Sequence, residues 1–124
     1  MNRILLVEDE ADLVTTYERL LQRKGYRAVL AGSRREGLLV VEREPLALVV
    51  TDVRLPDGDG LDIVRAARRT MPGPTPSLVV TGFASDASRT AALTAGASGY
   101  LSKPFAAAAF LSLVENTLKT PPGT

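Results

Sequence analysis

A near-continuous apolar stretch, residues 46–51, runs directly into a single carboxylate at Asp52. Pro56, Gly58 and Gly60 follow within a few positions, and such residues end a strand in a turn or loop. Near-continuous apolar character is typical of a parallel strand that is buried on both faces. Residues 46–51 are therefore predicted to form a central strand with Asp52 at its carboxyl end, where open α/β sheets bind their ligands.

The same alternation of apolar strands and amphipathic helices extends along the whole chain. Short strands are expected at residues 4–7, 28–31, 46–51, 78–81 and 99–102, with a helix after each. Ser33 and Glu36 have the spacing of a capping box at one helix start, and Ser85 or Asp86 is expected to cap another. Five strands that alternate with five helices predict an α/β fold. The favoured form is a flavodoxin-like, doubly wound (βα)5 sandwich with parallel strand order 2-1-3-4-5.

Length and composition exclude several classes of protein. The 124 residues favour one domain over residues 1–119, followed at 120–124 by a Pro/Gly-rich tail or the start of a linker. A net charge of +1 gives no case for a nucleic-acid surface. The absence of cysteine and histidine excludes disulfides, Ser-His hydrolase chemistry and zinc held by those residues. No apolar run is long enough for a signal peptide or membrane span, so we expect a soluble cytoplasmic protein without membrane association.

Polar side chains follow four of the five predicted strands. They are Glu8 and Asp9 after the first strand, Asp52 after the third, Thr81 as the last residue of the fourth, and Lys103 after the fifth. In the predicted order the remaining strand lies at the sheet edge, so these side chains should meet. Close carboxylates repel unless a cation is present, and oxygen donors favour Mg²⁺, which keeps waters and recruits phosphate oxygens. The set predicts a phosphoryl site in which Asp52 attacks while Lys103 and the metal neutralise charge.

Four motifs at these strand ends carry a resemblance to a known family. They are Leu5-Leu6-Val7-Glu8-Asp9-Glu10, Thr51-Asp52-Val53-Arg54-Leu55-Pro56 with Gly60, Val79-Val80-Thr81-Gly82, and Gly99-Tyr100-Leu101-Ser102-Lys103-Pro104-Phe105. Over essentially its whole length the chain resembles the receiver domain of two-component response regulators. Any one motif is a weak signal, but all four in this order, each at a strand end, are highly specific.

The resemblance implies a role for each matching position around the phosphoacceptor. Asp52 would accept a phosphoryl group from a phosphohistidine on a sensor histidine kinase or a phosphotransfer protein. Asp9, Asp52 and the main-chain carbonyl of Arg54 would bind Mg²⁺, with Glu8 acting mostly through water. Arg54 and Phe83 occupy positions that vary in the family and tune the lifetime of the phosphoryl group.

The resemblance also implies a switch and an output surface. Thr81 and Lys103 would contact phosphoryl oxygens, the Lys103–Pro104 peptide bond would be cis, and the rotamer of Tyr100 would follow Thr81. The face built from the fourth helix, fifth strand and fifth helix would control an output protein or a C-terminal effector domain. Ser98-Gly99 stands where one dimerising subgroup has acidic residues, which weakens the case for that homodimer and leaves another partner open. The domain would be regulatory, with no enzyme activity beyond its own phosphoryl transfer and dephosphorylation.

Each of these residues also has a plain structural interpretation. Acidic residues at positions 8–10 suit a helix start, Asp52 suits a turn, Thr81 a strand end, Lys103 a solvated surface and Tyr100 the core. Their arrival at one sheet edge favours a functional site over five separate explanations.

Three other functions compete with a phosphorylatable receiver. A pseudo-receiver would keep the fold as a constitutive interaction module, and it is disfavoured because no acidic, Thr or Lys position is lost. A haloacid-dehalogenase-like phosphatase would need a second aspartate where Arg54 stands. A flavodoxin would need a Ser/Thr/Gly-rich phosphate loop where Glu8-Asp9-Glu10 stands.

Overall fold

The computed structural model describes residues 2–71 and 73–119, so the predicted tail at 120–124 lies outside the described residues. Its helices and strands follow one another along the chain. They are β1 (Arg3–Val7), α1 (Ala11–Arg23), β2 (Arg27–Ala31), α2 (Arg34–Arg43), β3 (Leu48–Thr51), β4 (Arg54–Leu55), β5 (Gly58–Asp59), α3 (Leu61–Arg68), β6 (Ser77–Thr81), α4 (Asp86–Ala95), β7 (Gly99–Ser102) and α5 (Ala107–Lys119).

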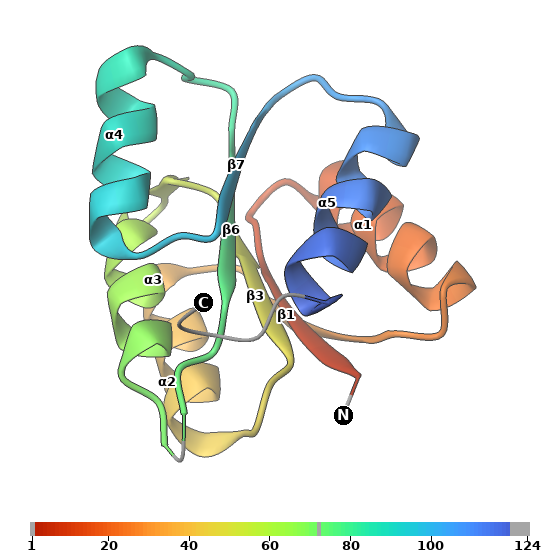
Figure 1. Cartoon of the computed structure of the whole chain (residues 1–124), viewed down its shortest axis with the longest axis horizontal. Coiled ribbons are helices and arrows are strands. Elements are labelled where there is room, and N and C mark those ends of the chain that lie inside the picture. Colours follow the sequence, from red (N-terminus) through yellow and green to blue (C-terminus); the bar gives the residue numbers. More distant parts are fainter. Residues whose placement is uncertain (1, 72, 120–124) are drawn as a thin grey trace.

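Five parallel strands form the central sheet in the order β2-β1-β3-β6-β7, which confirms the predicted topology. Helices α1 and α5 cover one face of this sheet, and α2, α3 and α4 cover the other (Figure 1). The register pairs Val7 with Thr51 and Thr81 with Ser102, so the carboxyl ends of the strands lie along one edge. Within the described ranges, no helix is both long enough and apolar enough to span a membrane.

The two faces of the sheet divide the hydrophobic core. Because side chains alternate along a strand, Leu6 packs on the side of Phe110 and α5, whereas Leu5 packs on the side of Ile63 and α3. All four of these side chains are fully or almost fully buried. Strands β1, β3 and β6 therefore have apolar partners on both faces, which explains their near-continuous apolar sequences.

A short hairpin between Asp52 and α3 was not predicted. Strands β4 and β5 pair antiparallel, with Arg54 opposite Asp59 and Leu55 opposite Gly58. Two-residue strands are too short to show an alternating pattern, so the sequence indicates only a loop here. The hairpin folds back to place α3 beside the end of β3.

Side-chain caps fix the start of two helices. The Ser33 hydroxyl accepts a hydrogen bond from the Glu36 N–H at 3.1 Å, and the Ser85 hydroxyl accepts one from the Ser88 N–H at 3.0 Å. The Glu36 carboxylate reaches the N–H of Gly32 at 3.3 Å instead of that of Ser33, so the predicted capping box is displaced by one residue on this side.

Replacing Ser33 with alanine should lower the free energy of unfolding by about 1 kcal/mol, because the Glu36 N–H loses its acceptor. Urea denaturation followed by circular dichroism measures the change. Ser112→Ala is the matched control, since Ser112 is exposed in the interior of α5 and caps nothing. Equal midpoints for the two variants would contradict the assigned cap.

Candidate functional site

Three strands of the sheet deliver Glu8, Asp52 and Lys103 to one place. The Lys103 Nζ donates to Glu8 Oε1 at 2.5 Å and to Asp52 Oδ2 at 2.9 Å, which links residues 95 and 51 positions apart. These three residues follow directly on β1, β3 and β7. Parallel strands with aligned ends are what bring side chains so distant in sequence into contact.

Backbone hydrogen bonds continue past the strand ends and hold these three residues in register. The N–H of Glu8 donates to the Ala31 carbonyl, that of Asp52 to the Val7 carbonyl and that of Lys103 to the Thr81 carbonyl, at 3.1, 3.1 and 2.8 Å. The main chain at each charged residue is therefore an extension of the sheet. Such anchoring limits the positions available to the side chains.

The charged groups of the site are largely removed from solvent. Side-chain exposure is 3% for Glu8, 11% for Asp52 and 14% for Lys103. Burial raises the pKa of the Glu8 carboxyl, although the ammonium of Lys103 opposes the shift. Burial would lower the pKa of Lys103, but hydrogen bonds to Glu8 and Asp52 outweigh it and hold that pKa above its usual range.

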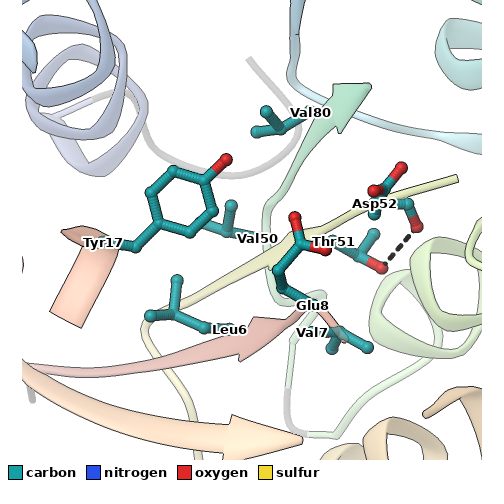
Figure 2. A pocket seen from close by; sticks show the side chains of 8 residues that line it. All are labelled: Leu6, Val7, Glu8, Tyr17, Val50, Thr51, Asp52 and Val80. Carbon is teal, nitrogen blue, oxygen red and sulfur yellow. Dashed lines mark hydrogen bonds between the residues drawn. The ribbon is translucent and has the colours of Figure 1, made fainter. Parts of the chain in front are cut away.

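The remaining carboxylate oxygens accept from nearby backbone amides. Glu8 Oε2 accepts from the N–H groups of Asp9 and Glu10 at 3.1 and 3.4 Å, and Asp52 Oδ1 accepts from the Arg54 N–H at 3.3 Å. Figure 2 shows Glu8 and Asp52 lining a pocket with Thr51, whose hydroxyl donates to the main-chain carbonyl of Asp52 at 2.9 Å. In each carboxylate, one oxygen therefore accepts from Lys103 and the other from a backbone N–H, which fixes the orientation of the group.

Gly60 lies directly against the main chain of the site. A Cβ at this position would be 1.8 Å from the carbonyl oxygen of Asp52 and 2.9 Å from its carbonyl carbon. Its N–H donates to the Val53 carbonyl at 2.7 Å, which holds the start of α3 against the loop after β3. Close approach of two backbone segments explains the glycine here, since its φ of −63° suits any residue.

Arg54 and Phe83 form a contact beside the carboxylates. The Arg54 guanidinium carbon lies 3.7 Å from the centroid of the Phe83 ring, within the range of a cation–π interaction. The ring is exposed to solvent, and it follows β6 as Arg54 follows β3. The two side chains therefore link the β4–β5 hairpin to the segment after β6 at the carboxyl edge of the sheet.

Thr81 and Tyr100 have other partners in this structure. Thr81 is fully buried at the end of β6, and its hydroxyl accepts from the Phe83 N–H at 3.0 Å. The Tyr100 hydroxyl donates to the Ser88 hydroxyl of α4 at 2.9 Å, and the ring packs with the buried cluster below α4. Both residues lie on the neighbouring strands β6 and β7, with Tyr100 opposite Val79 in the register.

Asp9 does not join the other two carboxylates. Its side chain is exposed, and within residues 2–71 and 73–119 no three acidic side chains form a group able to hold a metal ion. The expected close set of three carboxylates therefore differs from the structure. The ammonium of Lys103 pairs with Glu8 and Asp52 and offsets their repulsion, whereas the Asp9 side chain is exposed to solvent.

The side chains at the carboxyl edge of the sheet could bind a metal mainly through oxygen atoms. The carboxylates of Asp9, Glu8 and Asp52 follow β1 and β3, and the chain contains no histidine or cysteine to add nitrogen or sulfur. A hard divalent cation such as Mg²⁺ fits this donor chemistry, whereas zinc and copper do not.

The Lys103–Pro104 peptide bond is cis, the state that the resemblance implied.

Two structural roles near the site are not apparent from the sequence. Asp57 caps α2 from the hairpin, because its carboxylate accepts from the N–H groups of Arg34 and Arg35 at 2.7 and 3.0 Å. The bond from Arg35 chiefly lowers the pKa of Asp57. Tyr17 is buried on α1 and lines the pocket with Glu8, a position that helical spacing does not reveal. Asp57 lies 22 and 23 positions from the two N–H groups that it caps. Local sequence periodicity cannot predict a helix cap that comes from so far along the chain.

Comparison with known proteins gives one consistent result. The model of the response regulator receiver domain family matches residues 4–115. The photosynthetic apparatus regulatory protein RegA of Rhodobacter capsulatus is 36% identical over 101 residues, covering 82% of this chain and 54% of RegA. The chain therefore spans about half the length of this curated relative.

Solved structures resemble the whole fold. A CheY-like receiver domain protein from Methanospirillum hungatei is 31% identical, with a TM-score of 0.88 and coverage of 96% of this chain and 94% of that one. The receiver domain of the sensor histidine kinase PA1611 from Pseudomonas aeruginosa is also 31% identical, with a TM-score of 0.86 and coverage of 96% and 98%. That structure has a magnesium ion coordinated in its active-site cleft.

Proposed function

The chain belongs to the response regulator receiver domain family, and we propose that it is a phosphorylatable receiver whose phosphoacceptor is Asp52. The observation that carries the proposal is the contact of one ammonium, on Lys103, with the carboxylates of Glu8 and Asp52 at the carboxyl edge of the sheet. A nucleophilic carboxylate beside a fixed cation suits phosphoryl transfer, in which catalysis is mostly positioning and charge stabilisation.

The phosphoryl group would come from outside the chain, because the sequence contains no histidine. An oxygen of the Asp52 carboxylate would attack the phosphorus of a phosphohistidine on a histidine kinase or phosphotransfer protein. The new P–O bond forms as the P–N bond breaks, and the leaving imidazole nitrogen takes up a proton. Lys103 would then donate to the phosphoryl oxygens and offset their negative charge.

Mg²⁺ is the proposed cofactor, in keeping with the magnesium ion in the related PA1611 receiver. Asp9, Asp52 and the main-chain carbonyl of Arg54 would hold it, with Glu8 acting through water. When bound, the ion would neutralise charge on the phosphoryl oxygens during transfer.

A phosphoryl group adds about −1.5 to −2 charge and new acceptor oxygens at the site. Thr81 would donate a hydrogen bond from its hydroxyl to one of them, because the bond that this oxygen accepts from the Phe83 N–H leaves its own proton available. Tyr100 would then leave Ser88 and turn toward the space behind β6, shifting the population toward an active face at α4, β7 and α5. That face would control an output protein or effector domain, and a homodimer on phosphorylation belongs to the same proposal.

Incubation with acetyl phosphate and Mg²⁺ should add one acid-labile phosphoryl group to the wild-type chain, detected by intact-protein mass spectrometry. Asp52→Asn should remove the modification, and chelation of Mg²⁺ with EDTA should prevent it. Asp59→Asn is the matched control, because Asp59 is exposed in the nearby hairpin and its amide variant keeps an acceptor for the Leu61 N–H.

Failure of the wild type to become modified, or modification that survives Asp52→Asn, would reject the phosphoacceptor. The first result would favour the alternative function, a pseudo-receiver that acts as a constitutive interaction module.

A further inference from the structure

A surface hollow between α3 and α4 takes no part in the proposed reaction. It lies on the face of the sheet that α2, α3 and α4 cover (Figure 1). Its volume is about 330 Å³, and it is lined by Arg65, Arg68, Arg69, Thr94 and Ala95. The whole chain has a net charge of only +1, so three arginines around one hollow are a local concentration of positive charge.

The spacing of the three arginines places them on one side of α3. Arg68 and Arg69 follow Arg65 by three and four positions, and residues so spaced are neighbours on a helix surface. Arg65 and Arg68 belong to the last turn of α3, and Arg69 is its C-cap. All three are exposed to solvent. Their guanidinium groups are therefore accessible to a ligand in the hollow.

Gly96, which follows α4 directly, makes room for Arg68. It has a φ of +112°, and a Cβ at this position would lie 2.8 Å from Arg68 Cδ and 3.4 Å from Arg68 Nε. The side chain of Arg68 thus crosses from α3 to the carboxyl end of α4. Contact with Gly96 restricts this long side chain before any ligand arrives, which lowers the entropy cost of binding.

Within residues 2–71 and 73–119, only Arg65 of the three has an acidic partner. Arg65 Nη1 donates to Asp62 Oδ1 at 2.9 Å, and the other oxygen of this carboxylate accepts from Arg34 Nε at 2.8 Å. The guanidinium groups of Arg68 and Arg69 form no ion pair with a described residue. Two cations in the hollow are therefore available to a ligand.

The ends of α3 and α4 account for part of this charge. Both helices end beside the hollow, and a helix carboxyl end carries about half a negative charge that attracts cations. Together with Asp62, the two helix ends offset about two of the three positive charges, so roughly one charge remains. Interaction with the helix dipoles alone does not explain three arginines here.

We propose that this hollow is a docking site for an acidic segment of a partner protein, in which two neighbouring carboxylates pair with Arg68 and Arg69. The planar guanidinium group matches a carboxylate through two parallel hydrogen bonds. The proposed site is separate from the face at α4, β7 and α5, because its charged residues all belong to α3 and its C-cap. Docking there requires no phosphoryl group on Asp52.

Other polyanions fit the hollow less well than an acidic segment. Proteins that bind DNA strongly through its backbone make about 6–10 phosphate contacts. Basic clusters that bind anionic lipids contain about 4–8 lysines or arginines. Three arginines beside one aspartate provide fewer contacts than either, and their charge is matched by a few carboxylates.

The probe for this site is a capped oligoglutamate peptide, titrated into the ¹⁵N-labelled chain and followed by NMR. The Nε–Hε resonances of Arg68 and Arg69 should shift with saturation. Combined Arg68→Gln and Arg69→Gln should weaken binding roughly tenfold, the loss expected for two charge pairs at an exposed site. The matched control combines Arg19→Gln and Arg23→Gln, which remove the same charge from the exposed side of α1 on the opposite face of the sheet (Figure 1).

The control should bind the peptide as the wild type does at physiological salt, because distant charges are screened. Equal weakening by both double variants, or unmoved Arg68 and Arg69 resonances, would overturn the inference. It would also be overturned if oligoglutamine, or inorganic phosphate at the same concentration, shifted these resonances as much as oligoglutamate. None of these results bears on Asp52 as the phosphoacceptor, which the acetyl phosphate experiment tests separately.

Discussion

Gly60→Ala is expected to lower the free energy of unfolding by about 3 kcal/mol, at the upper end of the usual cost of overpacking. The added Cβ would lie 1.8 Å from the carbonyl oxygen of Asp52, and a main-chain atom cannot rotate away as the tip of a side chain can. Either α3 must move outward or the loop after β3 must shift. Chemical denaturation measures the loss, which is a large fraction of the stability of a small domain.

Gly32→Ala is the matched control for this prediction. Gly32 has no positive φ, and a Cβ there would meet nothing within 4 Å. Its variant should be as stable as the wild type, or slightly more stable through reduced freedom of the unfolded chain. If Gly60→Ala unfolded at the same denaturant concentration as Gly32→Ala, the close approach at Asp52 would be wrong.

Lys103→Met should destabilise the protein by about 3–5 kcal/mol near neutral pH, because it removes the cation shared by Glu8 and Asp52. The buried Glu8 carboxyl would be left beside the carboxyl of Asp52 without the cation that they share. Methionine preserves the length and apolar stem of the side chain, so lost packing contributes little. Lys24→Met is the matched control, since Lys24 forms an exposed pair with Glu115 at 3.8 Å and should contribute less than about 1 kcal/mol.

The cost of Lys103→Met should depend on pH in a definite direction. Glu8 already has a raised pKa because of its burial, and loss of the ammonium removes the strongest of the interactions that oppose the shift. An acid whose pKa is higher in the folded than in the unfolded state stabilises the fold below its unfolded value, near 4.5, and loses this contribution as pH rises through the folded value. The difference between variant and wild type should therefore shrink toward acidic pH. Denaturation at a series of pH values measures it, and a gap that widens on acidification would contradict the assigned pair.

Much of the fold could be predicted because its determinants are local. Leu61, Val64 and Ala67 recur at helical spacing in the sequence, and all three are buried in α3. Gly25 and Gly96 lie just after the ends of α1 and α4, where glycine is a common helix terminator, and both have positive φ. The hairpin of β4 and β5 was missed, because two residues per strand show no period.

The strand topology was enough to predict which residues meet at the site, but not how their side chains pair. Strand order and strand ends were enough to expect residues after β1, β3 and β7 at one edge. The choice of Lys103 as partner of both Glu8 and Asp52 depends on side-chain conformation, which no spacing encodes. The position of Tyr17 beside Glu8 could not be predicted for a related reason: helical periodicity indicates that a ring is buried and not which residues share its pocket.

The long separation between Lys103 and Glu8 ties the site to the completion of synthesis. A ribosome delivers the N-terminal strands first, so Glu8 and Asp52 emerge well before Lys103, which lies 95 residues after Glu8. Until β7 joins the sheet, the two carboxylates have no ammonium between them and repel. The charge-balanced site therefore arises only with the last strand, and a nascent or C-terminally shortened chain would lack the cation that its acidic pair requires.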